Sequence, residues 1–269
     1  MKKRGTKKRV ILLGAAGRIG TGFIEEYKKN KSYKKKYELI LGIHDKKFRD
    51  KNFEIKYIEL NDIKTLERAF KGVDVVVNLA ANPNPDATFK DLIKPNLVGS
   101  YNVFEAARIS KCKRVIFASS VHAIEGYGHG KQVKDVDAPK PIDFYGASKV
   151  FGEALCYVFF SKYGLSCLAI RIGAYTSDDK MRTLCFSRHD YDHVISQRDM
   201  CQLIHKCITA PQKIGYGILS GISNNTKKDM DLKLAKRIVG YKPQDNSYNL
   251  CKKIKLINLD TNWKKTKFQ

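Results

Sequence analysis

Short runs of apolar residues alternate with longer stretches of helical periodicity along the first two thirds of the chain. The apolar runs predict buried strands at 10–13, 38–43, 55–60, 73–79, 114–118 and 166–172. Between them, apolar residues recur at the spacing of one helix face, which predicts helices at 18–29, 63–70, 96–110 and 142–160. Strands that alternate with helices are typical of a parallel sheet. We therefore expect an α/β fold, a doubly wound parallel sheet with helices on both faces.

The pattern is looser beyond residue 172. We expect a helix at 198–209, a short strand at 217–222 and a helix at 228–239 that ends at Gly240 and Pro243. There is no internal repeat and no low-complexity linker. The expected organisation is a single structural unit, in which residues 1–172 form a nucleotide-binding core and residues 173–269 supply the remaining sheet elements and a small cap over the substrate.

Composition excludes several protein classes. Hydrophobic residues make up 43% of the 269 residues, which is enough for a packed core, so wholesale disorder is not expected. No apolar run approaches the roughly 18 residues of a membrane helix, and the basic N-terminus lacks the apolar region of a signal peptide. We expect a cytoplasmic protein with no membrane partner.

Charge, cysteine and histidine usage narrow the picture further. Lys and Arg number 51 against 27 acidic residues, a net charge of +24, but the Lys-rich runs lack interleaved aromatic residues on a recognisable nucleic-acid-binding motif, so we do not expect a nucleic-acid partner. The seven cysteines form no CxxC pair, which indicates a reducing compartment. The six histidines are scattered, and none stands at ligand spacing with cysteines or carboxylates, so no metal site is predicted.

The segment GAAGRIG links the first strand to the first helix. In that context Gly14 permits a tight turn, Gly17 lets the backbone approach a pyrophosphate, and Gly20 lets helix and strand pack closely. The helix N-terminus then offers N–H groups and partial positive charge to phosphates. The segment predicts a dinucleotide site in a Rossmann sheet.

An acidic residue follows the second predicted strand. Asp45 is placed to accept hydrogen bonds from the ribose hydroxyls of NAD and to repel a 2′-phosphate. Basic side chains come directly after it, at Lys46, Lys47 and Arg49, and these can accept NADP instead. The expected cofactor is NAD, with NADP as the alternative.

Two further motifs carry chemistry. YGASK places Tyr145 and Lys149 one turn apart on one helix face, where an ammonium group can lower the pKa of a phenol and make it a general base. VIFASS ends the fifth strand with Ser119 and Ser120, at the sheet edge where ligands bind. A serine there can hold a substrate hydroxyl while Tyr145 removes its proton.

In order, GAAGRIG, VVNLAA, NLVGSYNVFEAA, VIFASS, YGASK and LAIRIG resemble the extended short-chain dehydrogenases/reductases, the NAD-dependent epimerase/dehydratase family, over residues 10–173. The resemblance implies a catalytic Ser120, Tyr145 and Lys149, with Asn96 supporting the lysine side of a proton relay, and an adenine site flanked by Glu59, Leu60 and Asn61. The cofactor-binding residues it implies are Gly14, Gly17, Arg18, Ile19, Gly20, Asp45, Leu60, Leu79, Ala80, Ala81, Tyr145, Lys149 and Ile172.

A narrower resemblance is to uronate dehydrogenases and archaeal NAD-dependent aldose or aldose-phosphate dehydrogenases. It rests on SSVHAI, DDKMRTLCFSRHDY and ANPNPDA. It implies that His122 and Arg182 contact substrate, with Arg182 as the natural partner of a carboxylate or phosphate. Those enzymes carry asparagine where this chain has Val121, which leaves the identity of the substrate open. The substrate-binding residues so implied are Pro83, Ser120, Val121, His122, Tyr145 and Arg182.

The expected function is therefore an NAD-dependent oxidation of the anomeric hydroxyl of a pyranose, a hexuronate or related aldose, to a lactone. A nucleotide-sugar epimerase or dehydratase with tightly bound NAD is the alternative, although the short C-terminal portion favours a free sugar. A non-catalytic dinucleotide or nucleic-acid binder is a third hypothesis, and the intact Ser120, Tyr145 and Lys149 argue against it. By resemblance, we also expect a homodimer joined through the aromatic helix that follows Lys149.

Overall fold

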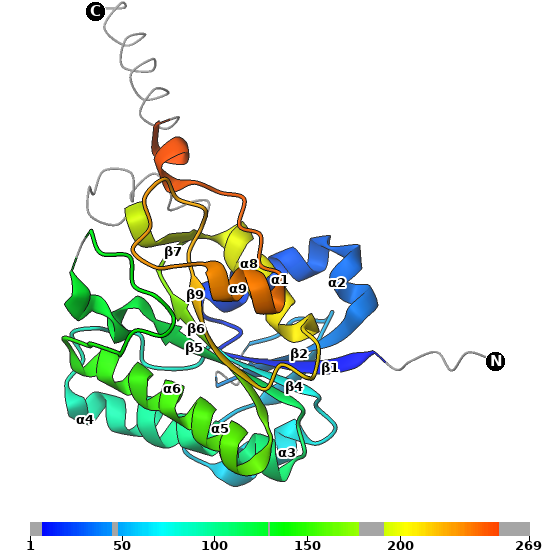
Figure 1. Ribbon diagram of the computed structural model, residues 1–269. Coiled ribbons are helices and arrows are strands. Elements are labelled where there is room, and N and C mark those ends of the chain that lie inside the picture. The colour runs from blue at the N-terminus through cyan, green and yellow to red at the C-terminus, as the bar shows by residue number, and fades with distance from the viewer. Residues whose placement is uncertain (1–6, 45–47, 129, 178–190, 253–269) are drawn as a thin grey trace, which may run out of the picture.

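The computed structural model describes residues 7–44, 48–128, 130–177 and 191–252. Its centre is a seven-stranded parallel sheet in the order β3-β2-β1-β4-β5-β6-β9 (Figure 1). The strands are β1 Lys8–Leu13, β2 Tyr37–Ile43, β3 Glu54–Tyr57, β4 Val75–Asn78, β5 Arg114–Ser120, β6 Ser166–Ile172 and β9 Tyr216–Gly221. The strand order reverses between β1 and β4. The carboxyl ends of these two strands therefore form a topological switch point, where α/β proteins bind ligands.

Helices cover both faces of the sheet, as Figure 1 shows. One face is covered by α3 Ile63–Phe70, α5 Gly99–Ile109 and α6 Phe144–Tyr163. The other is covered by α1 Arg18–Lys29, α2 Lys31–Lys36, α8 Gln197–Thr209 and α9 Lys233–Val239. Alternate residues of β1 belong to the two cores, with Val10 and Leu12 on one face and Ile11 and Leu13 on the other. The predicted doubly wound α/β fold is confirmed.

Several short elements lie around the carboxyl ends of the strands. They are α4 Phe89–Leu92, the π-helix η1 Ile93–Val98, the 3₁₀ turns η2 Val121–Ala123, η3 Glu125–Tyr127 and η5 Tyr191–His193, and the two-stranded pair β7 Ala174–Thr176 and β8 Val194–Ser196. β9 and α8, from beyond residue 173, pack beside β6 and β5. The division at residue 172 stays a prediction.

Most of the expected elements are present in the structure, with differences in bounds and some additional short elements. α1 and α3 begin and end where predicted. The helix expected at 96–110 begins as the wide turn η1, and that expected at 228–239 is shortened to α9. Neither β7–β8 nor α2 was expected. α2 forms in a Lys-rich run because the Asn30 side chain caps it and Tyr33 anchors it in the core.

Within the described part of the chain, free cysteines are buried at Cys112, Cys156, Cys167, Cys201 and Cys207. Cys251 is disulfide-bonded, which is at odds with the reducing compartment that the sequence indicates. Among the described residues, no helix combines the length and apolarity needed to cross a bilayer.

Candidate active site

The glycine-rich turn between β1 and α1 leaves no room for a side chain at Gly14 or Gly20. Gly14 has a positive φ of 73°, and a Cβ there would lie 2.9 Å from the backbone nitrogen of Ala80 on the neighbouring loop. A Cβ on Gly20 would lie 2.5 Å from the carbonyl oxygen of Gly14. No side chain caps the α1 N-terminus at Gly17. The turn therefore brings the backbone and the uncapped N-terminus of α1 to the sheet edge, as a pyrophosphate requires.

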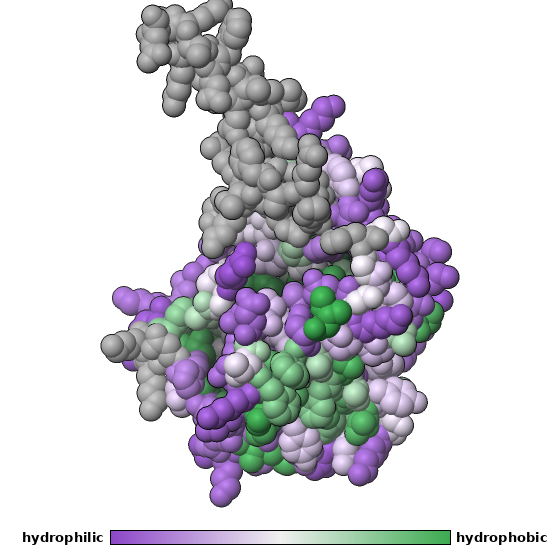
Figure 2. Space-filling view, turned by 90° about the vertical axis from the view of Figure 1, so that its left-hand side faces the viewer, coloured by the Kyte–Doolittle hydropathy of each residue, from purple (hydrophilic) through white to green (hydrophobic). Residues whose placement is uncertain are grey.

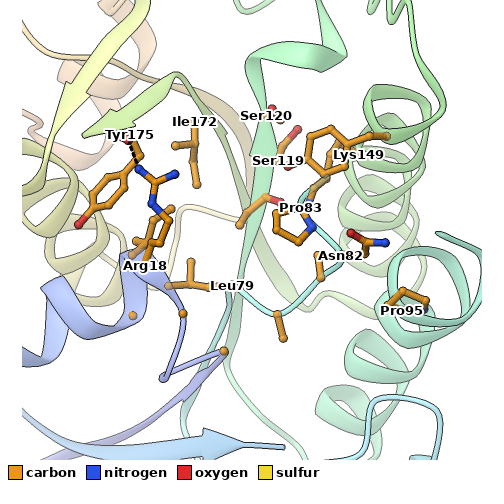
Figure 3. Close-up of a pocket in the computed structure, with 18 of the residues that line it drawn as sticks. Arg18, Leu79, Asn82, Pro83, Pro95, Ser119, Ser120, Lys149, Ile172 and Tyr175 are labelled. Carbon is orange, nitrogen blue, oxygen red and sulfur yellow. Dashed lines mark hydrogen bonds between the residues drawn. The ribbon is translucent and has the colours of Figure 1, made fainter. Parts of the chain in front are cut away.

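A cavity of about 940 Å³ opens from this turn along the carboxyl ends of the strands (Figure 3). Cofactor sites have volumes of this order. It brings together most of the predicted site residues, namely Gly14, Gly17, Arg18, Ile19, Gly20, Glu59, Leu60, Asn61, Leu79, Ala80, Ala81, Pro83, Ser120, Val121, His122, Tyr145, Lys149 and Ile172. Asp45 and Arg182 lie outside the described residues, and Asn96 does not line the cavity.

Ser120, Tyr145 and Lys149 meet at one end of the cavity. Ser120 ends β5, while Tyr145 and Lys149 lie one turn apart on α6. Tyr145 has a side-chain hydrogen bond with Ser120, and the Lys149 Nζ lies 5.4 Å from the centre of the Tyr145 ring. That Nζ donates to the carbonyl oxygen of Ala118 at 2.9 Å. A hydroxyl, a phenol and an ammonium group thus face the same space.

The electrostatics of this triad differ from the expectation. Burial raises the pKa of Tyr145, which the hydrogen bond with Ser120 only partly offsets. Burial also lowers the pKa of Lys149, to about 8. The expectation that Lys149 lowers the pKa of Tyr145 toward neutrality is wrong for this structure, because desolvation of the phenolate is the larger effect.

Asn96 holds the loop that follows β4. Its Nδ2 donates to the carbonyl oxygen of Asn82 at 3.1 Å and to the Ser148 hydroxyl at 3.0 Å. Its Oδ1 accepts from the backbone N–H of Asn82 at 2.8 Å. The structure therefore places Asn96 beside Ser148, tying the 79–83 loop to α6. Support of a lysine relay by Asn96 stays a prediction.

His122 lies in a carboxylate cluster that the sequence analysis missed. Its Nδ1 is 2.7 Å from an Asp143 oxygen and 2.8 Å from a Glu125 oxygen, and its ring meets the Tyr145 ring edge-on at 5.4 Å. The three groups are close enough to hold a metal ion, and a hydrogen bond already joins two of them, His122 and Asp143. Asp143 also caps α6 through the N–H of Gly146. The sequence feature that could have placed Asp143 at the start of α6 is its N-cap position.

Two more cavity residues come from the region where the sequence pattern loosened. His193 lines the cavity, with its Nδ1 3.1 Å from Asp229. Tyr175 lines it from β7, and its carbonyl oxygen accepts from Arg18 at 3.2 Å, as Figure 3 shows. Tyr175 lies on β7 and His193 in the 3₁₀ turn η5, and each of these elements has three residues, too few to give a hydrophobic period.

Among curated proteins, the chain is 30% identical over 256 residues to an L-arabinose 1-dehydrogenase (NAD(P)(+)) of Haloferax volcanii, covering 89% of this chain and 97% of that protein. It is 31% identical over 245 residues to a uronate dehydrogenase of Pseudomonas putida, covering 89% and 85%.

Solved structures give the same picture. A mutant of uronate dehydrogenase from Agrobacterium tumefaciens, complexed with NAD, superposes with a TM-score of 0.79 at 27% identity, over 93% of this chain and 89% of that one. Residues 10–205 match the sequence profile of the NAD dependent epimerase/dehydratase family. The chain therefore belongs to the NAD dependent epimerase/dehydratase family, which confirms the predictions of family, of NAD as cofactor and of an NAD-dependent enzyme.

Proposed function

We propose that this protein is an NAD-dependent sugar dehydrogenase that oxidises the anomeric hydroxyl of a pyranose to a lactone. The substrate class is a hexuronate or a related aldose or aldose phosphate. The observation that carries the proposal is the meeting of Ser120, Tyr145 and Lys149 in the cavity that begins at the glycine-rich turn. The activities for which the curated relatives are named, on arabinose and uronates, support this class of substrate.

The cavity fits a dinucleotide on chemical grounds. The glycine-rich turn at Gly14 and Gly17 and the α1 N-terminus would hold the pyrophosphate, and Leu60 would lie at the adenine end. Lys149 would hold the nicotinamide ribose. NAD, when bound, supplies the hydride acceptor for the carbon that is oxidised. The preference for NAD through Asp45 stays a prediction.

The chain's own groups handle the proton. Ser120 orients the anomeric hydroxyl, and the Tyr145 oxygen takes its proton as the carbon is oxidised. Since burial raises the pKa of Tyr145, the phenol is protonated at neutral pH, so we expect sugar oxidation to accelerate as pH rises above neutral. His122, Val121 and Pro83 line the same end of the cavity, where we propose that they contact the sugar together with Arg182.

The test is NADH formation with D-glucuronate, D-galacturonate, L-arabinose and D-glucose 6-phosphate. Tyr145→Phe keeps the ring but removes the proton acceptor, so we expect turnover to fall by about 10²–10⁴-fold while NAD still binds. Tyr157→Phe is the matched control, because it makes the same change at an exposed position of the same helix. Full turnover by Tyr145→Phe, or no NADH with any sugar, would contradict the proposal.

The family match also favours a second candidate, a nucleotide-sugar epimerase or dehydratase. Such an enzyme keeps its NAD and reduces it only transiently. Release of NAD on denaturation of the purified protein, together with interconversion of UDP-sugars and no net NADH, would support this candidate over the dehydrogenase.

We also propose a homodimer through the face formed by α4, η1, α5 and α6. Large apolar side chains are exposed there at Phe89, Ile93, Val98, Tyr101, Ile109, Phe144, Phe151, Tyr157, Val158 and Tyr163. Figure 2 shows apolar side chains gathered over the lower half of one face of the molecule. Light scattering should give a dimer that Val158→Glu disrupts, while Lys35→Glu, on α2, leaves the mass unchanged.

A further inference from the structure

A buried ionic network lies directly beneath the candidate active site. The Ser119 hydroxyl donates to a Glu153 carboxylate oxygen at 2.6 Å. Arg171 donates to both oxygens of the same carboxylate, from Nε and Nη2, at 2.8 Å each. The three residues are between 2% and 4% exposed. Together they join β5, α6 and β6 at the edge of the sheet where the cavity opens.

Glu153 extends the stripe of α6 that already carries the proposed chemistry. Tyr145, Lys149 and Glu153 are spaced by four residues, so they lie on one helix face. Each bonds one of the last three residues of β5, at 118–120: Tyr145 through a side-chain hydrogen bond, Lys149 to a carbonyl oxygen and Glu153 to a hydroxyl. The stripe therefore fastens α6 to the end of β5 at three consecutive positions.

The helix approaches the strand closely enough to make these bonds. A Cβ on Gly152 would lie 2.1 Å from the ring of Phe117, so only glycine allows α6 to pack at this distance. The network reaches the cavity wall at two residues. Ser119 belongs to the network and Ile172 follows Arg171, and both line the cavity. A displacement in the network would therefore move that wall.

Packing alone does not account for an ion pair at this place. Burying a carboxylate and a guanidinium costs desolvation energy, and apolar side chains of the same volume commonly stabilise a core equally well or better. What the pair does provide is a fixed geometry, since a bidentate guanidinium orients the carboxylate that in turn orients Ser119. Its charges also neutralise each other, so the pair adds no net charge to the core.

We propose that Glu153 is a positioning residue of the active site, acting through Ser119. Its carboxylate, oriented by Arg171, locks the end of β5 against α6 and so sets the separation of Ser120 from Tyr145 and Lys149. Glu153 touches neither sugar nor NAD. The inference rests on the proposed dehydrogenase function, because it concerns the alignment of those three groups.

The structure offers a matched pair of variants for the test. Ser119→Ala removes one buried hydroxyl that bonds an ionised side chain. Ser166→Ala does the same at the opposite end of these strands, where the hydroxyl accepts from Arg114 at 2.8 Å and donates to the carbonyl oxygen of Ile214 at 2.7 Å. Ser119→Thr keeps the hydroxyl, and a β-branched residue suits a strand. All three variants would be compared with the wild-type protein by thermal melting, NAD calorimetry and steady-state kinetics.

We expect both alanine variants to lower the melting temperature by similar amounts. Only Ser119→Ala should lower kcat, by about tenfold with little change in the KM for sugar, and weaken NAD binding by about threefold, since misalignment affects the chemical step most. Ser119→Thr should recover most of both losses. Ser166→Ala should keep kcat and the NAD dissociation constant within about twofold of wild type.

Two results would overturn the inference. One is wild-type kcat and NAD affinity in Ser119→Ala; the other is an equal loss of both in Ser166→Ala, which would show a purely structural effect. Failure of the proposed function is read separately. A wild-type protein that oxidises no sugar contradicts the dehydrogenase, whereas the NAD calorimetry still reports whether the network shapes the cofactor site.

Discussion

Two arginines are buried at opposite ends of the same pair of strands, and their surroundings differ. Arg114 begins β5, and its guanidinium donates to neutral acceptors alone, at Ser166, Cys207, Ala210, Pro211 and Ile214. Arg171, near the end of β6, is paired with the carboxylate of Glu153. One positive charge is dispersed over carbonyl dipoles, and the other is cancelled by an opposite charge.

The difference separates scaffold from site. Arg114 lies at the C-terminus of α8, where the helix carbonyls carry partial negative charge, and burial lowers the pKa of Arg114. It ties α8 and the following turn to the sheet, far from the cavity. At the other end, the Glu153–Arg171 pair holds the elements that carry Tyr145 and Lys149. An ion pair without net charge suits the edge of the sheet at which Lys149 is proposed to act.

The largest effect is expected from Arg171→Met. It leaves the carboxylate of Glu153 buried without its counter-charge, so we expect the free energy of unfolding to fall by about 3–5 kcal/mol, measured by urea denaturation. Adding Glu153→Leu removes the stranded charge and should restore most of that stability, although not the kcat. Equal stability of the single and double variants would show that the buried charge is not the cause.

Arg114→Met should cost less and act on stability alone. Its carbonyl partners lose their donor but remain uncharged, so we expect a loss of about 2–3 kcal/mol. At a temperature where the variant is folded, kcat should stay within about twofold of wild type, because Arg114 lies at the far end of the strands. A larger fall in kcat than in Arg171→Met would reverse the comparison.

His205 is a third buried basic residue, and it is buried in its neutral form. It stacks on Tyr33 at 3.8 Å and lies 3.2 Å from the Tyr37 hydroxyl, and burial lowers its pKa from 6.5 to about 4. A depressed pKa gives stability that is present above pH 6.5 and is lost as pH falls toward 4. We expect a loss on the order of 2 kcal/mol over that interval. In His205→Gln this part of the pH dependence should disappear from denaturant unfolding curves.

The smallest effect is expected at an exposed version of the arginine–glutamate pair. Arg9 contacts Glu54 at 2.5 Å, with about a third of each side chain exposed. Since solvent screens such a pair, Glu54→Gln should cost less than about 1 kcal/mol, and less still in high salt. A cost equal to that of Arg171→Met would mean that burial does not set the strength of these pairs.

The sequence predicted those parts of the site whose signals are local. The glycine turn, Tyr145 and Lys149 each belong to a contiguous motif, and the structure gathers them in one cavity. The sequence did not predict a role for Glu153, because its partner Arg171 lies on another element. A single carboxylate in an apolar helix does not indicate which residue it bonds. The sequence predicted His122 as a substrate-binding residue. It did not predict the neighbouring carboxylates of Asp143 and Glu125, because their positions depend on how the turns fold.

The fold shows the same limit. Helices α1 and α3 were bounded correctly because their periodicity and flanking residues are encoded in a few neighbouring positions. The sequence did not predict α2 in its Lys-rich run, because this helix depends on a distant contact, the packing of Tyr33 against His205 of α8.

The wide turn η1 bears on which changes of length the chain can tolerate. There the N–H of Gly99 reaches back to the carbonyl of Lys94, five residues earlier, so the turn holds one residue more than an α-helical turn. Deleting that residue would rotate Asn96 by about 100° and break its ties to Asn82. Insertions and deletions between relatives should therefore fall outside residues 93–98, even though this segment lies near the surface.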